Sequence, residues 1–347
     1  MPSPRVCVVL LNWNQPELTI KCVRCLLGQQ VPEGFSTVVI DNGSTAENVA
    51  ILQAGLGGEC LLLRNGENLG FAGGMNIGIE HARQHHFEYV WLLNNDAFPD
   101  AGCLARLVAA ADADPSLAAI TPKLVQTDDT TQELGGRIEW ETAGLLPLPH
   151  GPLPRPTPVG WFITGAALLI RMSALENDVA FDPRFFAYFE ESDLCTRLIK
   201  CGRWNLAIEE SARCVHLGGA TTGVASPLVT HLMVRNAWLY VRKHRPWTAW
   251  PRLWLRQAAV QLIHAGALDA KGNRPQANAV LSALWAGLAG SFGRPRRMTL
   301  PNAIGGPILR HFSGIARRMW GLANLLAPPS LRRGPLGSPE QSGTAEC

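Results

Sequence analysis

Residues 6–27, VCVVLLNWNQPELTIKCVRCLL, decide the fold class. The apolar run 6–11 is six residues long, which predicts a buried strand. The polar residues Asn12 to Asn14 follow it, and 16–27 then has a helical pattern. A strand, a polar turn and a helix in this order form the repeating unit of a parallel sheet.

The same unit recurs over the first 125 residues. Further strands are predicted at 37–40, 60–63 and 89–93, and further helices at 46–53, 72–83 and 101–111. This alternation predicts an α/β fold, with a mostly parallel sheet flanked by helices. Ligands of such sheets bind beyond the carboxyl ends of the strands, so the polar residues after each strand are candidate site residues.

The remainder of the chain changes character. Residues 144–158 are dense in Pro and Gly and are predicted to form a loop or an acceptor-side flap, followed by a strand at 161–170 and a helix at 190–201. Residues 226–326 have helical patterns, so a C-terminal helical appendage is expected. The predicted domains are a catalytic domain at 1–225, a basic, Trp-rich helical region at 226–327 and a disordered tail at 328–347.

Charge separates these regions. Residues 1–210 hold 14 Lys and Arg and 25 Asp and Glu, whereas 211–339 hold 17 Lys and Arg and one acid, Asp269. Such asymmetry indicates two regions with different tasks.

Three tryptophans in the basic region, Trp247, Trp250 and Trp254, have the i, i+3, i+7 spacing of one helix face, with Arg252 and Arg256 nearby. Basic helices with Trp bind anionic membranes, so association with a membrane surface is expected. The alternative is a helical cap that packs on the catalytic domain or on a second subunit of a homo-oligomer. Nucleic acid is not needed to explain the charge.

The sequence also bears on the compartment. The apolar run at the N-terminus is too short for a signal segment, and no run reaches the ~18 apolar residues of a spanning helix. The nine cysteines are scattered, which favours free thiols in a reducing cytosol. We expect a cytoplasmic protein, peripheral at the cytoplasmic face of the inner membrane. Cys22 and Cys25 have the CxxC spacing of a metal or redox site, but we interpret them as side chains that pack a helix.

Polar motifs follow each predicted strand. Asn12-Trp13-Asn14 and Asp41-Asn42-Gly43-Ser44 could bind a nucleotide or form structural turns. The segment 65–74, NGENLGFAGG, has small residues that allow close approach of a ligand. Asn94-Asn95-Asp96 places a carboxylate where Mg²⁺ or Mn²⁺ could be held against a diphosphate. Asp112-Ala113-Asp114 has the DxD pattern, but it lies at a helix end and is interpreted as structural.

The densest acidic group is Glu190-Glu191-Ser192-Asp193, which follows the aromatic cluster 185–189. Mutual repulsion and aromatic neighbours raise carboxylate pKa values, as a general base requires, although acids also favour the first turn of a helix. His216 ends a short apolar run and is a candidate metal ligand.

These pieces, in this order, resemble glycosyltransferase family 2 and its bacterial rhamnosyltransferase-like members. The resemblance covers roughly residues 5–245. The stretches that carry it are VVLLNWNQPELTIKCVRCLL, VVIDNGST, NGENLGFAGGMNIGI, YVWLLNNDAFPD, WFITGAALLIR and FFAYFEESDLCTRLIKCG.

The resemblance implies a GT-A nucleotide-sugar-binding fold and an inverting, metal-dependent glycosyltransferase. Its donor would be a nucleoside-diphosphate sugar, with dTDP-rhamnose as the family-level candidate, and its acceptor a hydroxyl of a glycan or lipid-linked saccharide in cell-surface polysaccharide synthesis. The implied roles are nucleotide or donor binding by Asn12, Asn14, Asp41, Asn68, Gly73 and Asn95, metal binding by Asp96 and His216, a general base at Glu191, and acceptor-site support by Asp193 and Glu190.

Two departures from the family pattern stand out. The metal motif Asn-Asn-Asp keeps one carboxylate, and the base is Glu191 where many relatives carry Asp. The alternatives are a nucleotidyltransferase, disfavoured because Asn12-Trp13-Asn14-Gln15 lacks a basic residue, and a non-catalytic sugar-nucleotide-binding protein.

Overall fold

The computed structural model describes residues 4–31, 33–132, 134–149, 151–175, 180–218, 226–295, 312–331, 333–334 and 336. The chain divides into two compact units. The first comprises Met1–Gly136 and Pro147–Thr221, and the second comprises Arg137–Leu146 and Thr222–Cys347. Of the expected disordered tail 328–347, residues 328–331, 333–334 and 336 are described, and 329–331 form a short 3₁₀ helix. The rest of the tail lies outside the described residues.

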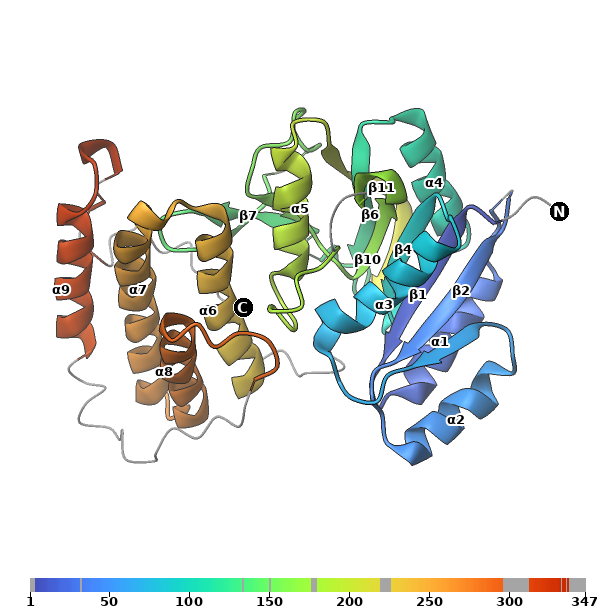
Figure 1. Ribbon diagram of the computed structural model, residues 1–347, viewed down its shortest axis with the longest axis horizontal. Helices are drawn as coiled ribbons and strands as arrows, with labels where there is room; N and C mark the ends of the chain where they lie inside the picture. Colours follow the sequence, from blue (N-terminus) through green and yellow to red (C-terminus); the bar gives the residue numbers. More distant parts are fainter. Residues whose placement is uncertain are drawn as a thin grey trace. The chain divides into compact units, whose positions relative to one another are not determined.

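An eight-stranded sheet forms the first unit, in the order β3-β2-β1-β4-β10-β6-β11-β5 (Figure 1). Strands β1 to β3 and β4 pair in parallel, as β6 and β11 do, whereas β10 runs antiparallel to both β4 and β6, and β5 runs antiparallel to β11. The predicted α/β sheet flanked by helices is therefore confirmed. The strands of this sheet are β1 Val6–Asn12, β2 Phe35–Asp41, β3 Leu61–Arg64, β4 Tyr89–Asn94, β5 Ala97–Pro99, β6 Leu117–Val125, β10 Ala167–Arg171 and β11 Asn205–His216. The strand β9 Trp161–Ile163 belongs to a separate three-stranded sheet.

Helices cover both faces of this sheet. Alternate side chains of β1, among them Val8 and Leu10, share one core with the helices α1, α2 and α4. On the other face α3 lies so close that a Cβ at Gly78 would come 2.2 Å from Val9 Cγ1. Glycine is therefore required there by packing. The helices of this unit are α1 Pro16–Leu27, α2 Ala46–Leu56, α3 Gly70–Gln84, α4 Cys103–Ala113 and α5 Glu190–Lys200, with the short 3₁₀ helix η1 Met172–Leu175.

Cys22 lies in this core and is fully buried. Its thiol donates to the carbonyl oxygen of Ala97 at 3.0 Å, and burial raises its pKa well above the usual range of a thiol. This supports the packing interpretation of the Cys22 and Cys25 pair.

Two sequence expectations need correction. The predicted loop 144–158 begins with a strand, β8 Gly144–Pro147, which pairs with β7 Gly135–Glu139. The predicted strand 161–170 is two strands, β9 and β10, because the chain bends at 164–166. There the Thr164 N–H donates to the Leu134 carbonyl, and the Ala166 carbonyl accepts from the Asn94 N–H at 2.9 Å.

The second unit is built from α6 Pro227–His244, η2 Trp247–Ala249, α7 Trp250–Ala270, α8 Arg274–Leu288, α9 Phe312–Leu325 and η4 Pro329–Leu331, with the β7–β8 hairpin. Helix α7 packs against α8 and α9, and α6 packs against α8. Ser226 caps α6 by accepting from the Val229 N–H at 3.2 Å. Within the described residues, no helix combines the length and the apolar character needed to cross a membrane.

The predicted tryptophan face is wrong in part. Trp247 is 75% exposed, but Trp250 is half-buried and its Nε1–H donates to the Arg245 carbonyl at 3.0 Å. Arg252 and Arg256 do not face solvent either, since both are buried. Trp247 lies in η2, ahead of α7, so the three tryptophans do not share one helix face. The two arginines are buried because they have a carboxylate partner inside the unit.

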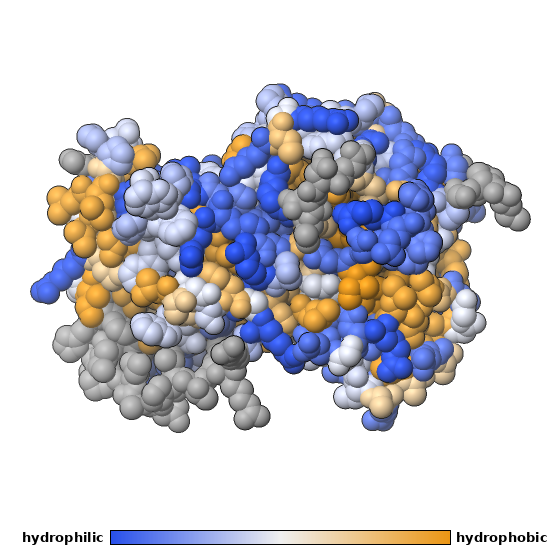
Figure 2. Space-filling view, in the orientation of Figure 1, coloured by the Kyte–Doolittle hydropathy of each residue, from blue (hydrophilic) through white to orange (hydrophobic). Residues whose placement is uncertain are grey.

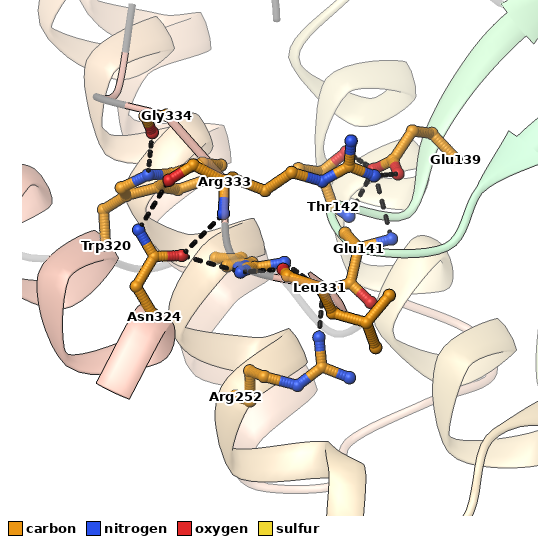
Figure 3. A network of polar contacts seen from close by, with 10 residues as sticks. Glu139, Glu141, Thr142, Arg252, Trp320, Asn324, Leu331, Arg333 and Gly334 are labelled. Carbon is orange, nitrogen blue, oxygen red and sulfur yellow. Dashed lines mark hydrogen bonds and ion pairs between the residues drawn. The ribbon is translucent and has the colours of Figure 1, made fainter. Parts of the chain in front are cut away.

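That partner is Glu141 of the hairpin (Figure 3). Its carboxylate pairs with both Arg252 and Arg256, and Arg256 also donates to the Asn324 side chain at 2.7 Å. Beside it, the more exposed Arg333 pairs with Glu139 at 3.0 Å. One buried carboxylate therefore joins the hairpin to α7, and Asn324 extends the network to α9.

Helix α9 carries a different kind of surface. Its buried side consists of Ala316, Trp320 and Ala323, whereas Ile315 and Leu322 are 45% and 49% exposed. Leu325 and Leu326 continue this apolar face, and the exposed Arg317 and Arg318 belong to the same helix. Figure 2 shows hydrophobic side chains gathered over α9 with hydrophilic ones next to them.

Candidate active site

The ends of three neighbouring strands are joined by buried side chains of the first unit. The Asn95 amide donates to Thr19 Oγ1 at 3.1 Å, and the Thr19 hydroxyl donates to Asn12 Oδ1 at 2.8 Å. The Asn12 amide then donates to Asp41 Oδ1 at 3.0 Å. All four side chains are buried. This chain of hydrogen bonds fixes Asp41 at the carboxyl edge of the sheet and gives Asn12 and Asn95 a structural task.

Asn14 lies at the same edge and is exposed. Its side-chain oxygen accepts from the Thr45 N–H at 2.9 Å and from the Asn48 amide at 3.1 Å. Its backbone N–H donates to Ser44 Oγ at 2.9 Å. Asn14 and Asp41, both predicted to bind nucleotide, are therefore brought together by the turn that carries Ser44.

Asn42 organises the segment 65–70, a role that was not predicted for it individually. Its amide donates to Asn68 Oδ1 at 3.1 Å and to the Gly70 carbonyl at 3.1 Å. Its oxygen accepts from the Asn65 amide and from the Leu69 N–H. The signal was present, because Asn42 stands in the same turn as Asp41.

Glycines let this segment come close to its neighbours. A Cβ at Gly43 would lie 2.5 Å from the Glu67 carbonyl carbon, and one at Gly73 would lie 2.8 Å from Leu69 Cβ. Gly70, with φ +75°, would place a Cβ 2.3 Å from the Phe186 carbonyl oxygen. That carbonyl also accepts from the Ala72 N–H at 3.1 Å. The segment with Asn68 and Gly73 thus adjoins the aromatic cluster.

The aromatic cluster has a strained backbone. Phe186, Tyr188 and Phe189 have φ values of 67°, 69° and 72°, which bulky residues rarely adopt. The strain ends where α5 begins, at Glu190. Left-handed bulky residues persist only where surrounding structure holds them, and they gather at functional sites.

The carboxylates at the start of α5 have different surroundings. Glu190 is 6% exposed, and the buried Oε2 atoms of Glu190 and Glu191 have no hydrogen-bond partner in the part of the chain that the structure describes. Burial, and then the charge of Glu191, raises the pKa of Glu190 well above its usual range. Burial also raises the pKa of Glu191. Asp193 differs from both, because Arg197 Nε donates to its Oδ2 at 3.0 Å.

Glu191 lies beside the bend between β9 and β10. A Cβ at Gly165 would stand 3.5 Å from Glu191 Cβ, and the next residue, Ala166, bonds to Asn94 through its carbonyl. Asn94 is two residues from Asp96. The bend therefore lies against the predicted base on one side and is hydrogen-bonded to the end of β4, which precedes the predicted metal ligand, on the other.

Asp96 and His216 face each other. His216 Nε2 is 3.4 Å from Asp96 Oδ1, and the Asp96 carbonyl accepts from the Leu217 N–H. The short strand β5 causes this, because its Ala97 pairs with His216 of β11. The other ring nitrogen, Nδ1, is 2.9 Å from Gln132 Oε1.

One carboxylate and one imidazole are donors that suit a divalent cation such as Mn²⁺. The described residues contain no group of three or more His, Cys, Asp or Glu side chains able to hold a metal. A cation at Asp96 and His216 would therefore need the donor's diphosphate oxygens as further ligands, as is common for Mg²⁺ in enzymes that use nucleotides.

The Asp112-Ala113-Asp114 sequence is structural, as predicted. Asp112 accepts from Arg5 at 2.8 Å and from the Tyr89 hydroxyl at 2.7 Å, and the Arg5 side chain lowers its pKa. Asp114 accepts from the Ser116 N–H at 2.9 Å.

Comparison with known proteins bears on the family of the chain. Residues 7–178 match the sequence profile of Glycosyl transferase family 2. N-acetylglucosaminyl-diphospho-decaprenol L-rhamnosyltransferase of Mycobacterium tuberculosis is 26% identical over 256 residues, which are 65% of this chain and 81% of that protein. Galactofuranosyltransferase GlfT1 of the same organism is 31% identical over 204 residues, 57% of this chain and 65% of that protein.

The fold also has a solved counterpart. The mannosyltransferase PcManGT from Pyrobaculum calidifontis, solved with GDP-Man and Mn²⁺, has a TM-score of 0.51 at 18% identity and covers 92% of this chain and 86% of its own. The class defined by fold and site is thus a GT-A glycosyltransferase. The chain belongs to glycosyltransferase family 2 and is similar to its bacterial rhamnosyltransferases. The predicted enzyme class is confirmed, and the non-catalytic alternative has no support.

Proposed function

We propose that this enzyme transfers a sugar, with inversion, from a nucleoside-diphosphate donor to a hydroxyl of a lipid-linked saccharide. The observation that carries the proposal is the pair Asp96 and His216 at the carboxyl edge of the sheet, 3.4 Å apart. Rhamnose is the proposed sugar and a polyprenyl-diphosphate glycan the proposed acceptor, because the name of the M. tuberculosis rhamnosyltransferase includes both.

The donor lies along the strand ends in this proposal. Asp41 and Asn14 contact the nucleoside, and Asn68 and Gly73 line the donor pocket. Their support is the shared turn at Ser44 and the closeness of the 65–70 segment to Asn42. Asn12 and Asn95 act indirectly, by holding Asp41 and the start of α1 in place.

Glu191 is the proposed general base. The acceptor hydroxyl oxygen forms the new bond to the anomeric carbon, the bond from that carbon to the diphosphate breaks, and the hydroxyl proton moves to the Glu191 carboxylate. Its raised pKa makes it a better proton acceptor than an ordinary Glu. Glu190 supports the acceptor site, and Asp193 supports α5 through its ion pair with Arg197.

Asp96 and His216 are the proposed ligands of a divalent cation. When bound, the cation supplies positive charge against the leaving nucleoside diphosphate. The Leu217 N–H donates to the Asp96 carbonyl at 3.1 Å and holds the backbone of Asp96 in place.

A donor screen tests the reaction. The purified enzyme with Mg²⁺ or Mn²⁺ is offered dTDP-rhamnose, UDP-glucose, UDP-galactose, UDP-N-acetylglucosamine and GDP-mannose, with and without a polyprenyl-diphosphate N-acetylglucosamine acceptor. We expect metal-dependent release of dTDP that increases with the acceptor, and an anomeric configuration opposite to that of the donor by NMR. Retention of configuration would contradict the proposal.

We also propose that the second unit binds the anionic cytoplasmic surface of the inner membrane. The support is the α9 apolar face, which comprises Ile315, Leu322, Leu325 and Leu326, and the exposed Arg317 and Arg318 of the same helix. Apolar side chains beside arginines suit the boundary between acyl chains and anionic headgroups. A lipid-linked acceptor would bring the same enzyme to that surface.

Flotation with vesicles containing phosphatidylglycerol tests this surface. The protein should float at physiological salt, the double variant Leu322→Glu and Leu325→Glu should not, and Ile51→Glu, an exposed position of α2, should float like the unaltered protein. If the unaltered protein stays at the bottom and light scattering shows a dimer that the double variant loses, the face is a contact between two copies.

A further inference from the structure

Gln132 stands where the chain returns to the sheet after β6. Its N–H donates to the Leu124 carbonyl at 3.0 Å, and Thr131 forms a bridge with Val125. Arg213 of β11 pairs with Asp100 at 2.6 Å and also with Asp129 of the intervening loop. The backbone of Gln132 is thereby held against the end of β11, where His216 lies.

The Gln132 side chain makes two contacts with one residue. Its Nε2 is 2.6 Å from the His216 carbonyl oxygen, and its Oε1 is 2.9 Å from His216 Nδ1. A carbonyl oxygen can only accept, so the amide nitrogen must be the atom that faces it. The amide oxygen consequently faces Nδ1, and an oxygen without a hydrogen requires Nδ1 to carry the proton.

This contact decides the state of the other ring nitrogen. In a neutral imidazole with Nδ1–H, Nε2 has a bare lone pair. Asp96 Oδ1 lies 3.4 Å from this nitrogen. A lone pair and a carboxylate oxygen repel each other unless a proton or a cation lies between or beside them. A divalent cation bound by both atoms would remove this repulsion.

We propose that Gln132 is a positioning residue that holds His216 as the Nδ1–H tautomer and directs its bare Nε2 to the cation site beside Asp96. The inference rests on the proposed function, because it assigns the cation to that site. Gln132 touches neither the donor nor the acceptor. It acts through His216, in the way that outer partners of metal-binding histidines fix the ring and its tautomer.

Three substitutions distinguish the hydrogen bonds of Gln132 from a general effect on its loop. Gln132→Met keeps the length of the side chain and removes both hydrogen bonds. Gln132→Glu keeps an oxygen that accepts Nδ1–H. Gln126→Met is the matched control, since Gln126 lies in the same loop with an exposed side chain.

The first measurement is the tautomer itself, without metal or turnover. Protein labelled with ¹⁵N-histidine is examined by long-range ¹H–¹⁵N NMR, and His216→Ala assigns the ring. We expect Nδ1–H for His216 in the unaltered protein, in Gln126→Met and in Gln132→Glu, and a mixture of tautomers in Gln132→Met. An Nε2–H ring in the unaltered protein would overturn the inference.

The second measurement is Mn²⁺ affinity in the presence of dTDP, followed by electron paramagnetic resonance. Gln132→Met should weaken it about 10–100-fold, and Gln132→Glu should restore most of it. Unchanged affinity in Gln132→Met, with His216→Ala weakened, would refute the role of Gln132 and leave the cation site intact. Unchanged affinity in His216→Ala would refute the proposed cation site itself. If Gln126→Met lowers the Mn²⁺ affinity as much as Gln132→Met does, the loss comes from a destabilised loop, and the inference is rejected.

Discussion

Glu190 and Glu191 are adjacent carboxylates, proposed to support the acceptor site and to act as the general base, respectively. Burial raises the pKa of both, and the charge of Glu191 raises that of Glu190 further. Among the described residues, neither Oε2 atom of this pair has a hydrogen-bond partner. Burying such a carboxylate lowers the stability of the folded protein, a cost that is common at active sites, where a raised pKa serves the reaction.

The pair predicts a pH-dependent stability. Because the folded pKa of Glu190 lies above its unfolded value, the native state binds more protons, and stability falls as pH rises through that interval. In Glu190→Gln this loss is absent. We expect the melting temperature of Glu190→Gln, relative to the unaltered protein, to increase between pH 5 and pH 8, as measured by differential scanning fluorimetry.

The control is Glu59→Gln, an exposed position, for which the difference should stay constant across the same range. A constant difference for Glu190→Gln as well would mean that Glu190 titrates as an ordinary surface carboxylate.

Sequence position explains which site residues could be predicted. Asp41 and Asp96 follow parallel strands, where ligands of such sheets gather, and the structure finds both at strand ends. Thr19 and Gln132 were missed, because their importance lies in partners that only the fold supplies: Asn12 and Asn95 for the first, and His216 for the second.

The segment from Phe185 to Phe189 is the element on which the site depends most. It carries three left-handed non-glycine residues and ends at the first turn of α5. Gly70 lies against the carbonyl of Phe186, so the donor segment and the acid-bearing helix support each other. Packing against the donor segment holds the aromatic segment in its strained backbone conformation.

Gly70→Ala tests this coupling. Its Cβ would meet the Phe186 carbonyl at 2.3 Å in a left-handed backbone, so it should displace the aromatic segment. We expect a fall in melting temperature together with a fall in turnover of at least tenfold. Gly57→Ala is matched, since Gly57 is also left-handed at φ +56° with nothing within 4 Å.

Gly57→Ala should lose only the stability that the backbone conformation itself costs, about 1 kcal/mol, and keep full turnover. Equal turnover in both variants would show that Gly70 does not couple the two segments.

Helices and strands with a clear pattern in their own residues could be predicted from the sequence. Strands that form only by pairing with a segment far away in the sequence could not. Helix α1 has the predicted bounds, and β4 begins at the predicted residue. The strand β5 is three residues long and exists because β11 pairs with it. No pattern within Ala97–Pro99 distinguishes such a strand from a turn, yet it is what brings His216 to Asp96.

The two units have net charges of opposite sign. In the basic second unit, a buried carboxylate neutralises part of the charge of two buried arginines. Glu141 is 4% exposed and pairs with two buried arginines, whereas Glu139 and Arg333 pair nearer the surface. Breaking a buried pair leaves an uncompensated charge, which costs far more than losing an exposed one.

Glu141→Gln should therefore destabilise the second unit by about 3–5 kcal/mol. Glu139→Gln should cost about 1 kcal/mol or less, because solvent screens that pair. Calorimetric unfolding of both variants measures the difference. If the two variants melt alike, the buried network does not stabilise the second unit.

The measurement that tests the central claim most directly is transfer by Glu191→Gln. Rhamnose transfer from dTDP-rhamnose to N-acetylglucosaminyl-diphospho-decaprenol is followed with saturating Mn²⁺, alongside dTDP binding by calorimetry and Glu59→Gln as control. We predict that Glu191→Gln lowers kcat by about 10²–10⁴-fold, as loss of a general base does, while dTDP still binds as tightly as before. Transfer at the unaltered rate by Glu191→Gln would contradict the account.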